Sequence, residues 1–206
     1  MARPSSALLS RRSCVFAGSD AGFLTSWPLS STTLAGCCHK LYTVPVTTRA
    51  YVETSIPSFY HEVRTEPDMV ARRDWTRAWW DERRRACYLV TSDAVLDELG
   101  RGGHPVAERA LEMTRSLEVL EIGPEIADIV EVYIRNRVMP NDPVGDALHL
   151  ALASYHKCDF LLTWNCRHLA NANKFGHIRR INAILGLYVP ALVTPLELLG
   201  GPEDEG

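Results

Sequence analysis

The chain has 206 residues, of which 46% are hydrophobic and 23% charged, and its formal net charge is −3. A chain of this size and composition can bury one sizeable core, and no apolar run approaches the roughly 20 residues that a membrane-spanning helix needs. We therefore expect a soluble protein with no membrane partner. Residues 1–50 hold five basic residues and one acid, so the remainder of the chain is clearly acidic. Such a body is no general binder of nucleic acid, and any RNA contact must be local.

Residues 1–46 are rich in Ser, Thr, Gly and Ala and show no helical or strand periodicity, which predicts disorder. We interpret this segment as an extension that results from a translation start assigned too far upstream. An organellar transit peptide is the alternative, because the segment is basic and poor in acids. The folded domain is expected over residues 47–200, and residues 201–206 are expected to form a solvated acidic tail.

Beyond this extension, short β-rich runs alternate with segments of helical periodicity. The predicted strands are 50–55, 88–91, 117–122, 160–164 and 191–194. The predicted helices are 67–85, 93–99, 105–115, 124–138, 146–155 and 177–187, with Ser92 capping the second and a loop at 171–176 before the last. Strands alternating with helices predict an α/β fold, a three-layer α/β/α sandwich with a central parallel sheet.

The predicted helix that starts at Asp146 is apolar on nearly every side, so we expect it to be buried rather than half exposed. The run 160–164 after it is typical of a fully buried parallel strand. Ligands of such sheets gather at the carboxyl ends of the strands, which places Asn165 near a candidate site. Asp146 is then either a functional acid or only the N-cap of its helix.

Three acids share one predicted edge of the sheet. Glu53 follows the first strand, Glu98 lies on the apolar side of the helix after the second, and Asp146 opens the buried helix. Carboxylates brought together repel by roughly 4 kcal/mol per pair at about 4 Å and an effective dielectric near 20, so we expect a cation among them. Oxygen ligands of this kind suit Mg²⁺ or Mn²⁺. The alternative is that Glu53 or Glu98 pairs with an arginine.

Six cysteines lie along the chain without the spacing of a disulfide framework, which is typical of a cytoplasmic protein with reduced thiols. A zinc site could be drawn from Cys158, Cys166, His168 and His177. We disfavour it, because the first of these ends a predicted helix and a predicted strand separates it from the second.

Four segments, "YVETSIPSFY", "TSDAVLDEL", "GDALHLALA" and "DFLLTWNCRHL", resemble the PIN-domain nucleases in their order and spacing, specifically the VapC-like branch of type II toxin–antitoxin systems. The likeness covers residues 48–200. It implies a compact α/β/α sandwich, Mg²⁺- or Mn²⁺-dependent cleavage of RNA phosphodiester bonds in the cytoplasm, and a small antitoxin protein as partner.

The resemblance also implies roles for single residues. Matched to the family's motifs, the catalytic set is Glu53, Glu98, Asp146 and Asn165, and the three acids would hold the metal. Among the secondary candidates, the family's hydroxyl beside the first acid would fall on Thr54 or Ser55, and the one before the last position on Thr163. A further secondary candidate, His149, comes from helical spacing and not from the resemblance, because it lies one turn after Asp146 and faces the same way. The alternative for His149 is a satisfied histidine of the core.

Two of these positions depart from the family pattern. Glu53 stands where the family commonly has Asp, which moves the carboxylate about one methylene further into the site. Asn165 replaces an acid, so only three formal negative charges face the metal, and a second ion would be held weakly or only together with substrate phosphate.

We therefore predict a divalent-metal-dependent endoribonuclease that acts as the toxin of a type II pair. The metal would activate a water that attacks phosphorus, and the carboxylates would position the metal. Two alternatives stay open: a catalytically weak PIN-like module that binds a partner, and a phosphatase or DNA nuclease that uses the same acids.

Trp75, Trp79 and Trp80 recur near helical spacing within the predicted helix 67–85. Large exposed apolar patches usually mark interfaces, so we interpret this stripe as a candidate homodimer or antitoxin surface. Base stacking on RNA and ordinary core packing are the alternatives.

Overall fold

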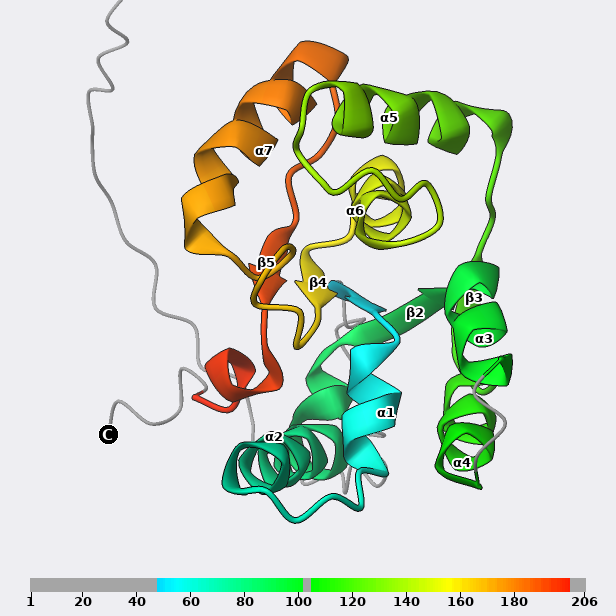
Figure 1. The fold of residues 1–206 in the computed structure, drawn as a ribbon, viewed down its shortest axis with the longest axis vertical. Helices are drawn as coiled ribbons and strands as arrows, with labels where there is room; N and C mark the ends of the chain where they lie inside the picture. Colours follow the sequence, from blue (N-terminus) through cyan, green and yellow to red (C-terminus); the bar gives the residue numbers. More distant parts are fainter. Residues whose placement is uncertain (1–47, 102–104, 201–206) are drawn as a thin grey trace, which may run out of the picture. The chain divides into compact units, whose positions relative to one another are not determined.

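The computed structural model describes residues 48–101 and 105–200. The expected extension over residues 1–46 and the expected acidic tail over residues 201–206 lie outside these residues. Five parallel strands form one sheet in the order β3-β2-β1-β4-β5 (Figure 1). The strands are β1 (Arg49–Val52), β2 (Tyr88–Ser92), β3 (Glu118–Leu120), β4 (Phe160–Leu162) and β5 (Ala191–Val193). All five coincide with predicted strands, and β1 occupies the centre of the sheet.

Helices connect these strands and cover both faces of the sheet, which confirms the predicted three-layer α/β/α sandwich. The α-helices are α1 (Ser55–Tyr60), α2 (Pro67–Ala78), α3 (Asp93–Gly100), α4 (Pro105–Thr114), α5 (Pro124–Arg135), α6 (Asp146–Tyr155) and α7 (Ala172–Leu185). The shorter turns are the π-helical η1 (Trp79–Arg83) and the 3₁₀-helical η2 (Arg84–Ala86) and η3 (Pro195–Leu198).

Consecutive residues of a strand face opposite sides of the sheet, and each side has its own core. Tyr51 and Leu161 belong to the larger core, which they share with α5, α6 and α7. Val52 and Leu162, the next residue in each strand, belong to a smaller core with α1 and η1. The period of two therefore places neighbouring strand residues in different layers.

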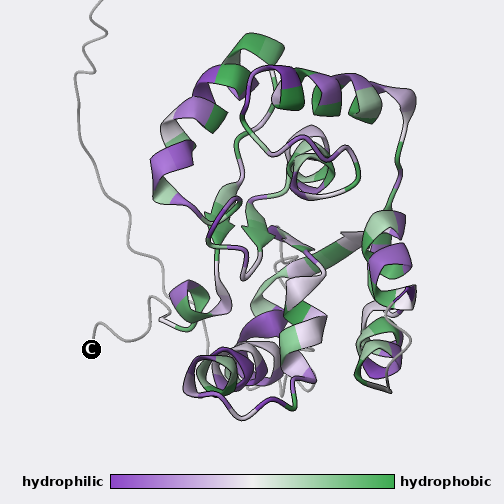
Figure 2. Cartoon of the chain, in the orientation of Figure 1, coloured by the Kyte–Doolittle hydropathy of each residue, from purple (hydrophilic) through white to green (hydrophobic). Residues whose placement is uncertain are grey.

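Helix α6 is the buried helix that the sequence predicts. Every residue from 147 to 154 is buried, because α6 is enclosed between the sheet and α5. Figure 2 shows α6 mainly in hydrophobic colours, whereas α7 alternates between hydrophilic and hydrophobic residues. Burial on all sides fixes both ends of α6, and its first residue, Asp146, is thereby fixed at the edge of the core.

Two local predictions are wrong. The first predicted strand, 50–55, ends at Val52, and helix α1, which is not among the predicted helices, begins at Ser55. Pro57 is compatible with this helix because it lies in the first turn, where a backbone N–H has no helical partner to lose. The loop predicted at 171–176 is helical instead. The side chain of Asn171 accepts a hydrogen bond from the backbone N–H of Asn173 and caps α7, which begins at Ala172, five residues before the predicted start.

The tryptophan stripe is mostly core. Trp79 and Trp80 are 1% and 5% exposed and pack in the smaller core, so the interpretation of the stripe as a partner or RNA surface is wrong for these two residues. Trp75 is 37% exposed and stacks on Trp164 at a centroid distance of 6.1 Å. The change from α- to π-helical hydrogen bonding at Trp79 accompanies this inward placement of two adjacent indoles.

Helices long and apolar enough to cross a bilayer are absent from the described residues.

Candidate metal centre

Glu53 is the first residue beyond β1, and the sheet holds it in place. Its backbone N–H donates to the carbonyl of Leu162 at 3.2 Å, which extends the pairing of β1 with β4 by one residue. Its Oε2 accepts hydrogen bonds from the backbone N–H of Ser55 at 3.1 Å, from the Ser55 hydroxyl, and from the Thr163 hydroxyl at 2.8 Å. Three donors from two strand ends therefore fix this buried carboxylate.

Glu98 reaches the same place from α3. It lies between Val95 and Leu99, both buried, as the predicted position on the apolar side of the helix requires. Its Oε2 accepts a hydrogen bond from the Thr54 hydroxyl, and its Oε1 lies 3.3 Å from Nε2 of His149. The carboxylate is half-buried, and its two contacts connect Thr54, which follows β1, to His149 on α6.

His149 is almost fully buried on α6, and both of its ring nitrogens have partners. Nε2 faces Glu98, and Nδ1 lies 2.9 Å from the hydroxyl of Tyr51. That hydroxyl is also 2.7 Å from the hydroxyl of Ser92 at the end of β2. Ser92 does occupy the N-cap position of α3, but its side chain does not cap the helix, because it bonds Tyr51 instead.

Glu53, Glu98 and His149 form a possible metal site. One ligand atom from each of them lies within 4.8 Å of the others. The predicted meeting of Glu53 and Glu98 at the carboxyl end of the sheet is therefore found. His149, a secondary candidate in the sequence, is the third member of this group, and Asp146, predicted as the third ligand, is not a member.

Asp146 lies beside this group as the first residue of α6. Gly145 occupies the N-cap position, so the alternative that Asp146 is only an N-cap is wrong. Oδ1 of Asp146 accepts a hydrogen bond from the side-chain amide of Asn165 at 2.8 Å, and Oδ1 of Asn165 accepts one from the backbone N–H of His168 at 3.1 Å. Asn165, which the sequence predicts at the site, thus orients a carboxylate.

Burial and contacts with neighbouring groups set the pKa values in the site. Burial alone would lower the pKa of His149, but its hydrogen bond to Glu98 and the negative charges of Glu53, Glu98 and Asp146 raise it above the usual value. Burial opposes ionisation of Glu98 as well, but the hydrogen bonds from His149 and Thr54 hold its pKa below the usual value. The pKa of Asp146 is raised, chiefly by burial.

The chain thus supplies a positive group of its own among the acids. Repulsion between the carboxylates predicted a cation, and a protonated His149 meets part of that requirement without any ion. Within residues 48–101 and 105–200, neither Glu53 nor Glu98 forms an ion pair with an arginine, so that alternative finds no support.

Two carboxylates and an imidazole are also a suitable donor set for a divalent ion. The Tyr51 hydroxyl can accept a hydrogen bond from Nδ1–H of His149 while it donates to Ser92. That arrangement leaves the Nε2 lone pair available, and metal-bound histidines are commonly oriented by such a second contact. The residues present therefore fit a divalent metal, provided that the Nε2 of His149 is unprotonated.

The zinc site drawn from cysteines and histidines finds no support in the described residues. Cys158 is buried before β4 begins, whereas Cys166 is exposed after β4 ends, so the strand keeps the two sulfurs apart. The only group of potential ligands found in residues 48–101 and 105–200 is the one that contains His149.

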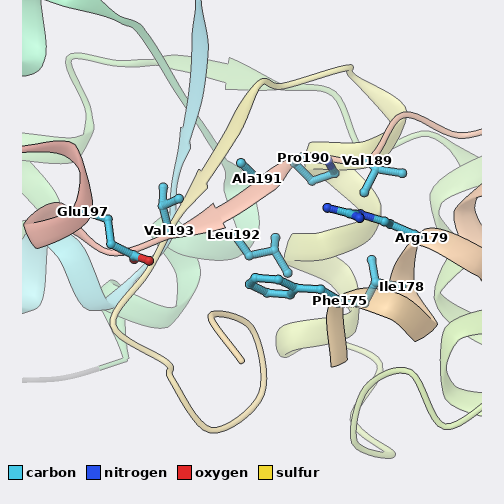
Figure 3. A pocket seen from close by; sticks show the side chains of 9 residues that line it. All are labelled: Phe175, Ile178, Arg179, Val189, Pro190, Ala191, Leu192, Val193 and Glu197. Atoms are coloured by element: carbon cyan, nitrogen blue, oxygen red, sulfur yellow. The ribbon is translucent and has the colours of Figure 1, made fainter. Parts of the chain in front are cut away.

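A cavity of about 420 Å³ lies between α7 and β5, at the outer edge of the sheet (Figure 3). Figure 3 shows an apolar floor of Phe175, Ile178 and Leu192, with Arg179 and Glu197 toward opposite ends. None of the predicted site residues lines it. The chemistry-bearing residues are thus gathered at the carboxyl end of the strands and not in this cavity.

No family model and no curated protein matches this chain.

The sequence prediction missed Tyr51 and Ser92, which orient His149. A signal for the first was present, because a tyrosine in a fully buried strand must find a partner for its hydroxyl. The alternation of β1 places Tyr51 on the same side of the sheet as α6, and that is where its partner lies.

Proposed function

We propose that the protein is a divalent-metal-dependent endoribonuclease of the PIN type. The observation that carries this proposal is the convergence of Glu53, Glu98 and His149 at the carboxyl end of a parallel sheet, with the Asp146–Asn165 pair beside them. The choice of RNA as substrate, and the role as toxin of a type II pair with a small antitoxin, rest on the resemblance of four sequence segments to that family.

In this proposal Glu53, Glu98 and His149 hold the ion. A bound Mg²⁺ or Mn²⁺ supplies a water of lowered pKa and neutralises charge that develops on the phosphate. The hydroxyls of Ser55 and Thr163 fix the Glu53 carboxylate. Thr54 does the same for Glu98. These contacts hold the ligand oxygens in place before substrate arrives, which reduces the reorganisation that the reaction requires.

Asp146 has a different task from the one the sequence predicts. Asn165 holds its Oδ1, which leaves Oδ2 to accept a hydrogen bond from the attacking water. Because burial raises its pKa, Asp146 is a better proton acceptor than an exposed aspartate. Asp146 therefore orients the water and takes up its proton, and Asn165 keeps the carboxylate in position.

The direct test is cleavage of a labelled single-stranded RNA by the full chain, with Mn²⁺ and with EDTA. We expect Asp146→Asn and Glu98→Gln to lower the cleavage rate at least about 100-fold while circular dichroism stays unchanged. Asp97→Asn is the matched control, because Asp97 is an exposed acid on the same helix as Glu98. Wild-type rates for Asp146→Asn, or undiminished cleavage in EDTA, would remove the proposal.

The same assay with a single-stranded DNA and with a phosphomonoester addresses the third class of function. Cleavage of DNA in preference to RNA would replace the ribonuclease by a DNA nuclease, and release of phosphate from the monoester would indicate a phosphatase. Preference for RNA is the expected result.

One observation favours the alternative of a partner-binding module. Both nitrogens of His149 already have partners within the chain, so the acid group can persist without metal. Isothermal titration with Mn²⁺ separates the two functions. A module predicts no binding and no difference between the wild type and Glu53→Gln, whereas the nuclease predicts binding that this substitution weakens.

The toxin role has its own test. Induced expression of the wild-type chain should arrest growth of a bacterial host, and Asp146→Asn should not. A neighbouring reading frame that encodes a short DNA-binding protein, and relief of the arrest by its coexpression, would support the antitoxin partner. Size-exclusion chromatography with light scattering tests the expected homodimer.

A further inference from the structure

A second group of polar residues lies next to Asp146, on a part of the molecule that the proposed mechanism does not use. An open cavity of about 640 Å³ has Arg137, His168 and Lys174 in its wall. The other lining residues are Ile134, Met139, Pro140 and Asn141. Among the residues that the structure describes, no acid lines this cavity, and its basic side chains suit an anion.

Arg137 has a backbone conformation that its residue type rarely adopts. Its φ is 58°, in the left-handed region. The N–H of Val138 bonds the carbonyl of Tyr133 at 2.9 Å, so Arg137 follows the C-cap residue of α5, at the position where helices commonly place glycine. Its side chain is exposed, and no ion pair of Arg137 is recorded among the described residues. An arginine thus stands where the backbone favours glycine, and among the described residues its charge has no acidic partner.

Lys174 approaches the same cavity from the first turn of α7. Its Nζ donates to the carbonyl of Val138 at 3.2 Å, which holds the ammonium group beside the Arg137 segment and leaves two of its protons for a ligand. The positive end of the α7 dipole adds to the attraction for a negative group.

His168 connects this cavity to the metal centre. Its backbone N–H bonds Asn165, whose amide in turn bonds Asp146. His168 and Lys174 both act electrostatically to lower the pKa of Asp146. Nδ1 of His168 is buried without a hydrogen-bond partner, and a rotation of the ring that brings it to a bound anion would satisfy it.

We propose that Arg137, His168 and Lys174 form a subsite for a backbone phosphate of single-stranded RNA, adjacent to the phosphate that is cleaved. The subsite rests on the proposed nuclease function for its ligand. The strand would run from the acids, past Asp146, to a wall that carries the side chains of Arg137, Lys174 and His168. Arginine and lysine offer charge-assisted hydrogen bonds to phosphate oxygens without reading the base, so the subsite positions the strand and leaves its sequence unread.

The test measures binding without cleavage. A fluorescein-labelled single-stranded RNA of about 12 nucleotides is titrated with the full chain in EDTA, and binding is followed by fluorescence anisotropy. Arg137→Gln and Lys174→Gln are each expected to weaken binding about tenfold. Each should also lower the slope of log affinity against log salt by about 0.7. Arg180→Gln is the matched control, because Arg180 is an exposed arginine on α7 outside this cavity, and it should leave both quantities unchanged.

A second measurement keeps the test independent of RNA length and of variant folding. Titration of the isotope-labelled wild-type chain with inorganic phosphate, followed by NMR, should shift the amide signals of residues 137, 168 and 174. Absence of these shifts, or RNA affinity that neither variant lowers relative to Arg180→Gln, would overturn the subsite.

The subsite and the nuclease can fail separately. RNA binding that depends on Arg137 and Lys174, with no cleavage in Mn²⁺, would retain the subsite and remove the nuclease. Metal-dependent cleavage with an unchanged KM in both variants would retain the nuclease and remove the subsite.

Discussion

Nε2 of His149 lies 3.3 Å from Oε1 of Glu98, so a buried imidazole and a half-buried carboxylate share the space in which a metal would bind. The same nitrogen can carry a proton toward Glu98 or offer a lone pair to an ion, but not both. This contact therefore determines how the site responds to metals and to substitutions.

The imidazole ligand should make the site prefer Mn²⁺ to Mg²⁺, because transition ions accept nitrogen ligands more readily than Mg²⁺ does. We expect Mn²⁺ to bind the wild-type chain at least about tenfold more tightly, and His149→Gln to reduce this preference. Free Mn²⁺ at about 100 times its Kd should stabilise the fold by about 2.7 kcal/mol. Isothermal titration and thermal unfolding measure these effects. Equal affinities for the two ions would place His149 outside the ligand set.

Tyr51→Phe should damage both stability and metal binding. The substitution leaves Ser92 and Nδ1 of His149 without their buried partner, which is expected to cost about 1–3 kcal/mol of unfolding free energy. Loss of the contact that orients a ligand should also weaken Mn²⁺ binding about 10-fold or more. Tyr188→Phe is the control, since the Tyr188 hydroxyl makes an exposed hydrogen bond to Asp159. Similar urea midpoints for the two variants would contradict this role of Tyr51.

The tryptophans should differ in their contribution to stability. Trp79→Ala removes a fully buried side chain and is expected to lower the unfolding free energy by about 3–5 kcal/mol. Trp75→Ala removes a side chain that is 37% exposed, and we expect a clearly smaller loss. Urea denaturation followed by circular dichroism compares the two. A larger loss of unfolding free energy for Trp75→Ala than for Trp79→Ala would show that the assignment of Trp79 to the core and of Trp75 to the surface is incorrect.

The thiols should react in order of their exposure. Burial raises the pKa of the Cys158 thiol to about 11, whereas Cys166 is exposed. At pH 8 iodoacetamide should therefore modify Cys166 in the native chain and leave Cys158 unmodified until urea is added, as peptide mass spectrometry can show. Rapid native labelling of Cys158 would indicate that α6 and β4 open readily.

The raised pKa of Cys158 also predicts how stability depends on pH. Because burial holds this pKa above its ordinary value in the folded chain, the contribution of Cys158 to the unfolding free energy is fully present below about pH 9 and is lost as the pH rises toward about 11.

The layers of the fold follow from patterns that are visible in the sequence. Each predicted strand is found, because a short apolar run between two helical segments is too short for a helix of its own and is typical of a buried strand. The two errors are at helix starts. Pro57 and the asparagine-rich segment before α7 suit loops and first helical turns equally well, so composition alone does not separate the two.

Helical periodicity does not predict which residue of α6 lies among the acids of the site. Asp146 and His149 are one turn apart on one face of α6, so the sequence predicts that both approach the acids. The difference between them is a rise of about 4.5 Å along the helix axis, and this decides which of them lies among Glu53 and Glu98. That depth depends on how α6 packs against the sheet and α5, and the pattern of residues contains no such information.

The central position of β1 affects the order in which the protein folds during its synthesis. Glu53 lies near the start of the described chain, yet the Thr163 hydroxyl that fixes it is supplied 110 residues later, after β4. During synthesis on the ribosome, the hydroxyl that fixes Glu53 is therefore missing until β4 and Thr163 have emerged and docked. Long-range parallel pairing of this kind forms slowly. The candidate metal centre is therefore completed late in biosynthesis.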